Sequence, residues 1–196
     1  MPLTGRNLAK SLQQRSILFP LLDNVLDSSL GLAGTGLGNI QIMDWELGCL
    51  EIAAQRGFRH EFLEFFERVK PEDGSACAHA LRTRHQIVIR DVANDKSFSS
   101  RGKEIVLGAG VRAVQSTPIV SSSGAFVGML STHYPHCRVP SPGEMKALAA
   151  LAQQTANTLI AELAYQNQSQ AIARTRKAIA SSRELLARVD KAQRTL

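Results

Sequence analysis

The pattern that most constrains the fold is a pair of apolar segments, rich in β-branched residues and joined by a short turn. They span 112–120 and 125–134 and flank Ser-Ser-Ser-Gly at 121–124. Glycine tolerates a positive φ, and serine hydroxyls bond locally to the backbone, so this pattern predicts a β-hairpin. The second segment ends in the polar residues Ser131, Thr132 and His133. Buried polar side chains need partners or water, so we expect a partly polar interior beside this hairpin.

The rest of the first 140 residues alternates short helical and short strand patterns. Apolar periodicity predicts a helix that begins near Pro20 and is broken by the glycine at 31. Further strands are predicted at 39–44, 49–55 and 86–89, and further helices at 60–69, 75–84 and 102–107. Asp73 or Ser75 is expected to cap the helix at 75–84. Antiparallel hairpins dominate this order, which favours an α+β fold over a βαβ repeat.

The longest helical pattern follows Pro140 and Pro142. Apolar residues form a broad stripe over 142–163, and beyond a polar patch at 166–170 the spacing changes to alternating steps of three and four. This spacing is typical of a coiled-coil seam, formed by Ile172, Thr175, Ile179, Ser182, Leu186 and Val189. Two of the six seam residues carry hydroxyls, so we expect the helix to need a second copy of itself for stability.

The positive charge is concentrated in the C-terminal tail. The net charge is +6, and residues 166–196 hold seven basic residues against two acidic ones. The tail has neither a DNA-binding motif nor interleaved aromatic residues, so we expect a solvated helix face rather than nucleic-acid binding. No apolar run approaches the roughly 18 residues of a membrane span. Three cysteines without C-x-x-C spacing favour free thiols in a reducing cytoplasm.

The central hairpin also resembles a known family. The segment VRAVQSTPIV, the turn and then AFVGMLSTH resemble the central hairpin of a GAF domain, a small-molecule-sensing module of bacterial signalling proteins. The resemblance continues through 38–58, 73–92 and 142–163. It implies an α+β fold, with a central antiparallel sheet of about six strands flanked by helices and a long C-terminal helix. It also implies three parts: a lead-in at 1–17, a GAF domain at 18–164 and a basic, coiled-coil-like helix at 165–196.

The resemblance implies a pocket between one sheet face and the segment 75–110. The polar residues expected to line it are Cys77, Gln115, Thr117, Ser131 and His133. The strand register leaves open whether Gln115 and Thr117 face this pocket or the helices on the other side. A few polar groups in a mostly apolar cavity suit a small molecule. The sequence contains no Gly-x-Ser-x-Gly motif or other catalytic set, so we expect a binding protein rather than an enzyme.

Cys77 supports an alternative function. It falls in the first turn of the helix predicted at 75–84, where the helix dipole favours a thiolate, so the protein could be a thiol-based redox sensor or a reductase-like enzyme. The competing interpretation is a small buried side chain. The reductases of this family need a second cysteine in the loop after the next strand, and residues 94–101 contain none.

The sequence supports none of the usual cofactors. Cys77-x-His79 is not a zinc pattern, and no second paired motif suggests a metal or haem site. In the bilin-binding relatives a histidine occupies the place of His133, but their thioether cysteine is missing at 101–104, so covalent bilin binding is not expected.

The loop at 94–98 resembles part of the signature of cyclic-nucleotide GAF domains. Asn94 and Lys96 are not adjacent, and serines stand where an acidic pair is expected, so cyclic nucleotides are not supported.

The expected partners are a second copy of the chain, an unidentified small molecule and a separate output protein such as a histidine kinase.

Overall fold

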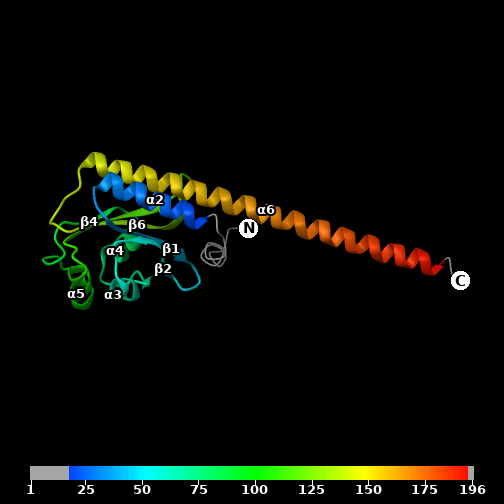
Figure 1. Ribbon diagram of the computed structural model, residues 1–196, viewed down its shortest axis with the longest axis horizontal. Helices are drawn as coiled ribbons and strands as arrows, with labels where there is room; N and C mark the ends of the chain where they lie inside the picture. The colour runs from blue at the N-terminus through cyan, green and yellow to red at the C-terminus, as the bar shows by residue number, and fades with distance from the viewer. Residues whose placement is uncertain (1–17, 194–196) are drawn as a thin grey trace. The chain divides into compact units, whose positions relative to one another are not determined.

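The computed structural model describes residues 18–193 and the side chains of residues 19–183, so the lead-in expected at 1–17 lies outside the described residues (Figure 1). Two compact units divide the chain, the first ending at Asn157 and the second beginning at Thr158. One helix, α6, runs over Pro142–Gln193 and contributes to both units. The two helical patterns on either side of 166–170 therefore lie in one continuous helix.

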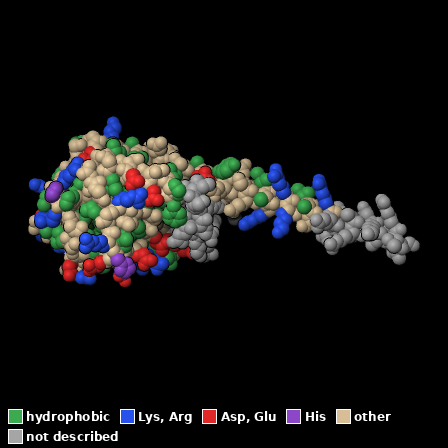
Figure 2. Space-filling view, viewed as in Figure 1, with side chains coloured by type: hydrophobic (Ala, Val, Ile, Leu, Met, Phe, Trp, Pro, Cys, Tyr) green, Lys and Arg blue, Asp and Glu red, His purple; other side chains and the backbone are tan. Residues whose placement is uncertain are grey.

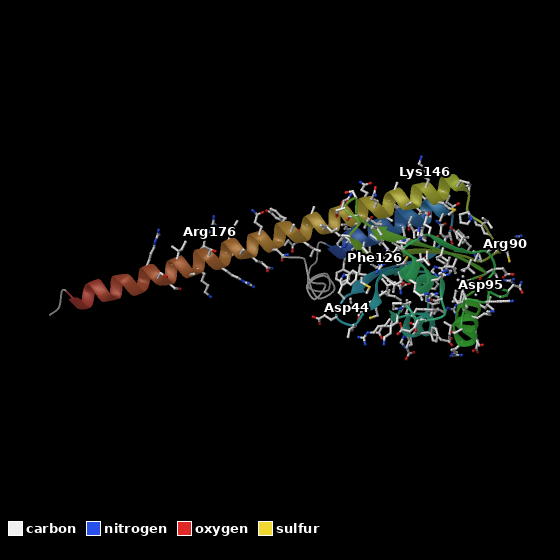
Figure 3. All side chains as sticks on the ribbon, turned by 180° about the vertical axis from the view of Figure 1, so that it is seen from behind. Asp44, Arg90, Asp95, Phe126, Lys146 and Arg176 are labelled. Atoms are coloured by element: carbon white, nitrogen blue, oxygen red, sulfur yellow. The ribbon has the colours of Figure 1, made fainter. Side chains whose placement is uncertain are left out.

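The first unit is built on a six-stranded sheet in the order β3-β2-β1-β6-β5-β4. Every neighbouring pair in it is antiparallel, which confirms the α+β fold expected from the sequence. The strands are β1 (Leu37–Asp44), β2 (Cys49–Arg56), β3 (Arg68–Val69), β4 (Ile87–Ile89), β5 (Ala113–Val120) and β6 (Phe126–Tyr134). Figure 3 shows Asp44 and Phe126 at one end of the sheet and Arg90 and Asp95 at the other.

The hairpin of β5 and β6 forms as its turn residues predict. Gly124 has a φ of +82°, and its N–H donates to the Ser121 carbonyl over 3.0 Å. At the third residue of β6, a Cβ on Gly128 would lie 2.1 Å from the Gln41 backbone oxygen. Only glycine therefore allows β1 to pair closely with β6 at this point.

Helices cover both faces of the sheet (Figure 1). One face packs against α2 (Leu18–Ala33) and the first part of α6, and the other against α3 (His60–Phe65), α4 (Ala76–Thr83) and α5 (Ser100–Gly108). Gly38 marks the α2 face of β1, because a Cβ there would lie 2.7 Å from the Leu30 side chain. Since strand residues alternate between faces, Asn39 and Gln41 point to the face covered by α3, α4 and α5.

Two helix boundaries differ from the sequence predictions. The helix expected at 60–69 ends at Phe65, and Val69 lies instead in β3, where it pairs with Leu50 of β2. Strand pairing gives hydrogen-bond partners to the edge of β2, which a longer helix would leave unpaired. The helix α2 continues through the glycine at 31 to Ala33.

The cap of α4 is Ser75 rather than Asp73. The Ser75 hydroxyl oxygen accepts a hydrogen bond from the Ala78 N–H over 3.2 Å, which satisfies one free donor of the first turn. Asp73 instead accepts from the Lys70 N–H over 2.7 Å in the preceding turn. This cap fixes where the first turn of α4 meets the sheet.

Candidate ligand cavity

A small cavity lies between the sheet and the helices α3, α4 and α5. Its volume is about 20 Å³, which is enough for one water molecule. Strand residues, the first turn of α4, two phenylalanines of or next to α3, the loop before α5 and α5 itself contribute to its wall. The lining residues are Asn39, Gln41, Phe62, Phe66, Ser75, Ala76, Cys77, Phe98, Val106, Val114 and His133.

Two amides of β1 enter this cavity with unused oxygen atoms. Asn39 is 2% exposed and Gln41 is fully buried. Asn39 Oδ1 and Gln41 Oε1 have no hydrogen-bond partner among the described residues. Gln41 Nε2 donates only a long bond of 3.5 Å to the Phe66 carbonyl. Buried amides are normally paired, so these two atoms mark a place where a partner is expected.

His133 lies on β6 among aromatic rings. Its ring stands edge-on to Phe58, with centroids 4.9 Å apart, and to Phe62 at 5.7 Å. Burial lowers its pKa from 6.5 to about 3, so the imidazole is neutral at physiological pH. Its Nδ1 atom is buried and also lacks a partner among the described residues. His133 therefore contributes an uncharged side chain with an unpaired nitrogen to the lining of the cavity, which also includes Asn39 and Gln41.

Cys77 belongs to a closed group of three small polar side chains. Its sulfur lies 3.2 Å from Ser131 Oγ and 3.5 Å from Ser116 Oγ, and the two hydroxyls are 2.9 Å apart. Burial raises the pKa of the Cys77 thiol, and the hydrogen bonds from Ser131 and Ser116 offset this only in part. The thiol is therefore protonated at neutral pH and is a poor nucleophile.

The structure answers the question of register that the sequence left open for Gln115 and Thr117. Val114 pairs with His133 and Ser116 with Ser131, so these residues face the cavity. Gln115 and Thr117 alternate with them along β5 and therefore face away from it. Thr117 Oγ1 accepts a 3.1 Å hydrogen bond from Gln86 Nε2, which also donates to the Met145 carbonyl of α6. The expectation that Gln115 and Thr117 line the cavity is thus corrected.

The face of β6 that is turned toward α6 carries a separate polar network. Thr132 Oγ1 and the Tyr134 hydroxyl are 3.0 Å apart, and the hydroxyl donates to Glu144 of α6 over 2.9 Å. Arg138 donates to the other oxygen of Glu144 over 2.6 Å and to the Ala33 carbonyl over 2.9 Å. Residues 131–134 therefore alternate between the cavity and the start of α6.

Of the five residues expected at the site, Cys77 and His133 line the cavity. Ser131 lies behind this lining, where its hydroxyl is hydrogen-bonded to Cys77. Sequence reasoning missed Asn39 and Gln41. The signal was present, because they alternate with Ile40 and Ile42 along one predicted strand. Phe62 and Phe66 fall in the helix predicted at 60–69 and Phe98 falls in the loop at 94–98, so their sequence context does not indicate a cavity wall.

A larger groove lies outside the cavity, with a volume of about 420 Å³. Phe62 contributes to the walls of both spaces. The other residues lining the groove are Gly57, Arg59, Glu61, Ile105, Gly108, Ala109 and Gly110. Figure 2 shows acidic and basic side chains along the edge of the molecule over α3 and α5. The groove thus carries the charged residues Arg59 and Glu61 and shares the Phe62 side chain with the inner cavity.

The loop at 91–99 holds Phe98 in the cavity wall. Lys103 Nζ donates to the carbonyls of Asp95 over 2.8 Å and Ala93 over 3.2 Å. The Ser99 N–H donates to the Gly74 carbonyl over 3.1 Å. Asn94, considered above in relation to cyclic nucleotides, donates to Asp91 over 2.7 Å within this loop.

No group of three or more His, Cys, Asp or Glu side chains in residues 18–193 could hold a metal ion. No described helix is both long enough and apolar enough to span a bilayer.

Comparison with known proteins identifies relatives of this architecture. The model of the GAF domain family matches residues 21–159. No curated protein matches the chain. A domain of a protein assigned as a two-component sensor histidine kinase from Sinorhizobium meliloti 1021 superposes with a TM-score of 0.67 at 19% identity, covering 79% of this chain and 99% of that one.

Two other solved structures are similar. The GAF domain from an Acinetobacter phosphoenolpyruvate-protein phosphotransferase has a TM-score of 0.63 at 13% identity, covering 84% of this chain and 95% of that one. The free methionine-R-sulfoxide reductase from Neisseria meningitidis, solved in complex with its substrate, has a TM-score of 0.59 at 16% identity, covering 80% and 85%. At these identities the likeness is one of fold.

Proposed function

This chain belongs to the GAF domain family, and from that premise we propose that its cavity binds a small molecule and that its C-terminal helix passes the ligand state to an output protein through a homodimer. The coarser role, a signalling or sensing module, follows from the family and from its sensor-domain neighbours. A histidine kinase or another signalling protein is the proposed output partner.

The observation that carries the ligand proposal is that three residues lining one cavity each hold a buried, unpaired polar atom. Asn39 Oδ1, Gln41 Oε1 and His133 Nδ1 are buried and have no partner among the described residues. Each such atom costs about 1–3 kcal/mol when it is left unsatisfied. A bound molecule that pairs with all three recovers this free energy. The neighbour from Neisseria supports the proposal, because its solved structure holds a substrate.

The second unit supplies the argument for dimerisation. Tyr165, Ile172 and Ile179 recur every seven residues and are 66%, 46% and 49% exposed. An apolar stripe with this repeat is the seam of a coiled coil, and burying it requires another helix. In the sequence Leu186 continues the repeat, although its side chain lies outside those described.

The charges beside this seam favour a parallel pair. Taking Ile172 and Ile179 as position a of the heptad, Arg176 and Arg183 fall at position e, and Ala171 and Ala178 fall at position g. In a parallel pair position e faces position g of the partner helix, so each arginine meets an alanine. In an antiparallel pair the arginines would face each other and repel.

The test compares two double variants of the full chain. Ile172→Asp with Ile179→Asp places charge in the seam and is expected to give a monomer. Ala173→Asp with Ala180→Asp places the same charges one position further along, on the exposed outer face, and should stay a dimer. Analytical ultracentrifugation at micromolar concentration measures both. A wild-type chain that is monomeric there rejects the homodimer.

The ligand part is tested by native and denaturing mass spectrometry of the protein as purified. A small molecule that accompanies the wild-type chain and is lost from an Asn39→Leu variant would support binding in the cavity. A molecule retained equally by that variant would assign the binding elsewhere.

A further inference from the structure

The walls of the cavity are uncharged. Within the described part of the chain, none of its lining residues is Asp, Glu, Lys or Arg. His133 is neutral at physiological pH, and burial also favours the neutral thiol of Cys77. The first turn of α4 adds at most about half an elementary charge at its N-terminal end. A fully charged group desolvated here would have no side chain of opposite charge to pair with.

The side chains that hold the unpaired atoms can hydrogen-bond to a donor and an acceptor of one ligand. Asn39 and Gln41 each carry an amide, whose oxygen accepts and whose NH₂ donates, and either group can be turned into the cavity. The neutral ring of His133 has one donor and one acceptor. Asn39 stands opposite Ser131 in the β1–β6 pair, so it lies one diagonal step from His133 on the same face. A ligand that offers a donor and an acceptor side by side matches this set.

The remaining walls select a flat molecule. Phe62, Phe66 and Phe98 contribute aromatic rings, and Val106 and Val114 add aliphatic surface. Aromatic rings pack favourably against other planar rings in stacked or edge-on arrangements. Ser75 and Cys77 at the start of α4 already hydrogen-bond within the protein, so the unpaired polar groups of the lining lie on β1 and β6, and the aromatic walls suit the face or edge of a ring.

The size of the cavity sets a condition on binding. About 20 Å³ admits water but not a ring, so the wall must move. Phe62 lines both the cavity and the outer groove of about 420 Å³, and its ring is stacked on Phe58 with centroids 3.7 Å apart. Because Phe62 contributes to both walls, we expect a ring that enters from the groove to displace the Phe62 side chain.

We propose that the cavity selects an uncharged planar amide, either a carboxamide on an aromatic ring or a ring lactam, and rejects the matching carboxylate. This inference rests on the proposed function, in which the same cavity binds a small molecule. Asn39, Gln41 and His133 recognise the amide, and Phe62 and Phe98 cover the ring.

The experiment uses two matched pairs of probes on the full chain: nicotinamide with nicotinate, and uracil with its 6-carboxylate. The members of each pair share a ring and differ in the charged group. Binding is measured by ligand-observed NMR and isothermal titration up to the millimolar range. At least one neutral probe is expected to bind at least about tenfold more tightly than its carboxylate, because the desolvated carboxylate has no counter-charge.

Two glutamines give a matched pair of variants. Gln41 and Gln115 are both buried and have unpaired amide atoms, but they lie on opposite faces of the sheet. Gln41→Leu should weaken the neutral probe by about two- to tenfold, the effect of one lost hydrogen bond, and Gln115→Leu should leave its affinity unchanged. Thermal unfolding checks that both variants fold, and the comparison of wild-type affinities needs neither variant.

The outcomes separate this inference from the proposed function. A carboxylate that binds as tightly as its amide overturns the selection for uncharged ligands, and so does an absence of binding by both amide probes. A copurified anionic metabolite in the cavity would also overturn it and leave the sensing proposal standing. A monomeric chain would reject the proposed dimer without affecting the probe comparison.

Discussion

Replacing Gln115 by leucine should stabilise the protein. Gln115 is 1% exposed, and neither its Oε1 nor its Nε2 has a partner among the described residues. Leaving such a group unsatisfied costs about 1–3 kcal/mol, and leucine has a similar size without polar atoms. We therefore expect Gln115→Leu to increase the free energy of unfolding by about 1–3 kcal/mol. For a protein of this length each kcal/mol raises Tm by about 2–4 °C.

Thr117→Val is the matched control, two residues along the same strand and on the same face. The Thr117 hydroxyl accepts from Gln86 Nε2, so its removal leaves a donor unpaired and should destabilise the protein by about 1 kcal/mol. The two substitutions remove polar atoms from neighbouring positions and are expected to act in opposite directions.

Urea unfolding followed by circular dichroism measures both variants, and thermal scans give Tm. A lower midpoint for Gln115→Leu would mean that its amide is paired in solution, for example through bound water. That result would also weaken the same reasoning for Asn39 and Gln41, on which the ligand proposal depends. The experiment therefore tests the use of unpaired buried amides as markers of a binding site.

Three further predictions concern pH, packing and thiol chemistry. Because the pKa of His133 is about 3 in the folded chain against 6.5, the unfolded chain binds more protons between these values; stability should fall as pH drops through this window, and His133→Phe should flatten the decrease in urea titrations at successive pH values. Gly128→Ala forces a Cβ to within 2.1 Å of the β1 backbone and should lower the free energy of unfolding by at least about 2 kcal/mol. Gly143→Ala in α6, whose Cβ meets nothing closer than 3.9 Å, should raise it by about 0.5–1 kcal/mol. A urea midpoint that rises in Gly128→Ala and falls in Gly143→Ala would contradict the strand pairing described. Burial raises the pKa of the Cys77 thiol above 9.0, so iodoacetamide at neutral pH should modify the exposed Cys137 first, as peptide mass mapping would show, and rapid labelling of Cys77 would instead revive the redox hypothesis.

Local patterns predicted the parts of the fold that local physics determines. The hairpin at 112–134 follows from its turn residues, and the sequence limited the cap of α4 to Asp73 or Ser75, of which the structure shows Ser75. The helix expected at 60–69 failed for a non-local reason. Its periodicity fits a helix, but pairing of Val69 with Leu50 satisfies the edge of β2 instead.

The candidate site was predicted only in part, because its geometry depends on register. Cys77 and His133 reach the cavity, but the sequence could not decide which face of β5 carries Gln115 and Thr117. A shift of one residue would exchange the two faces. The unpaired state of Asn39 Oδ1 depends on every neighbour around it, and no local pattern contains that information.

The side chains of residues 131–134, at the end of β6, alternate between the two faces of the sheet, and this has a mechanical consequence. Ser131 and His133 face the cavity, whereas the Tyr134 hydroxyl, which also contacts Thr132 Oγ1, donates to Glu144 at the start of α6. The same peptide planes carry both sets of side chains. We therefore expect a change in the backbone torsion at His133 to shift the Tyr134 hydroxyl and its bond to Glu144 in the first turn of α6. Four consecutive residues of backbone join the cavity to the helix, rather than a long relay of side chains.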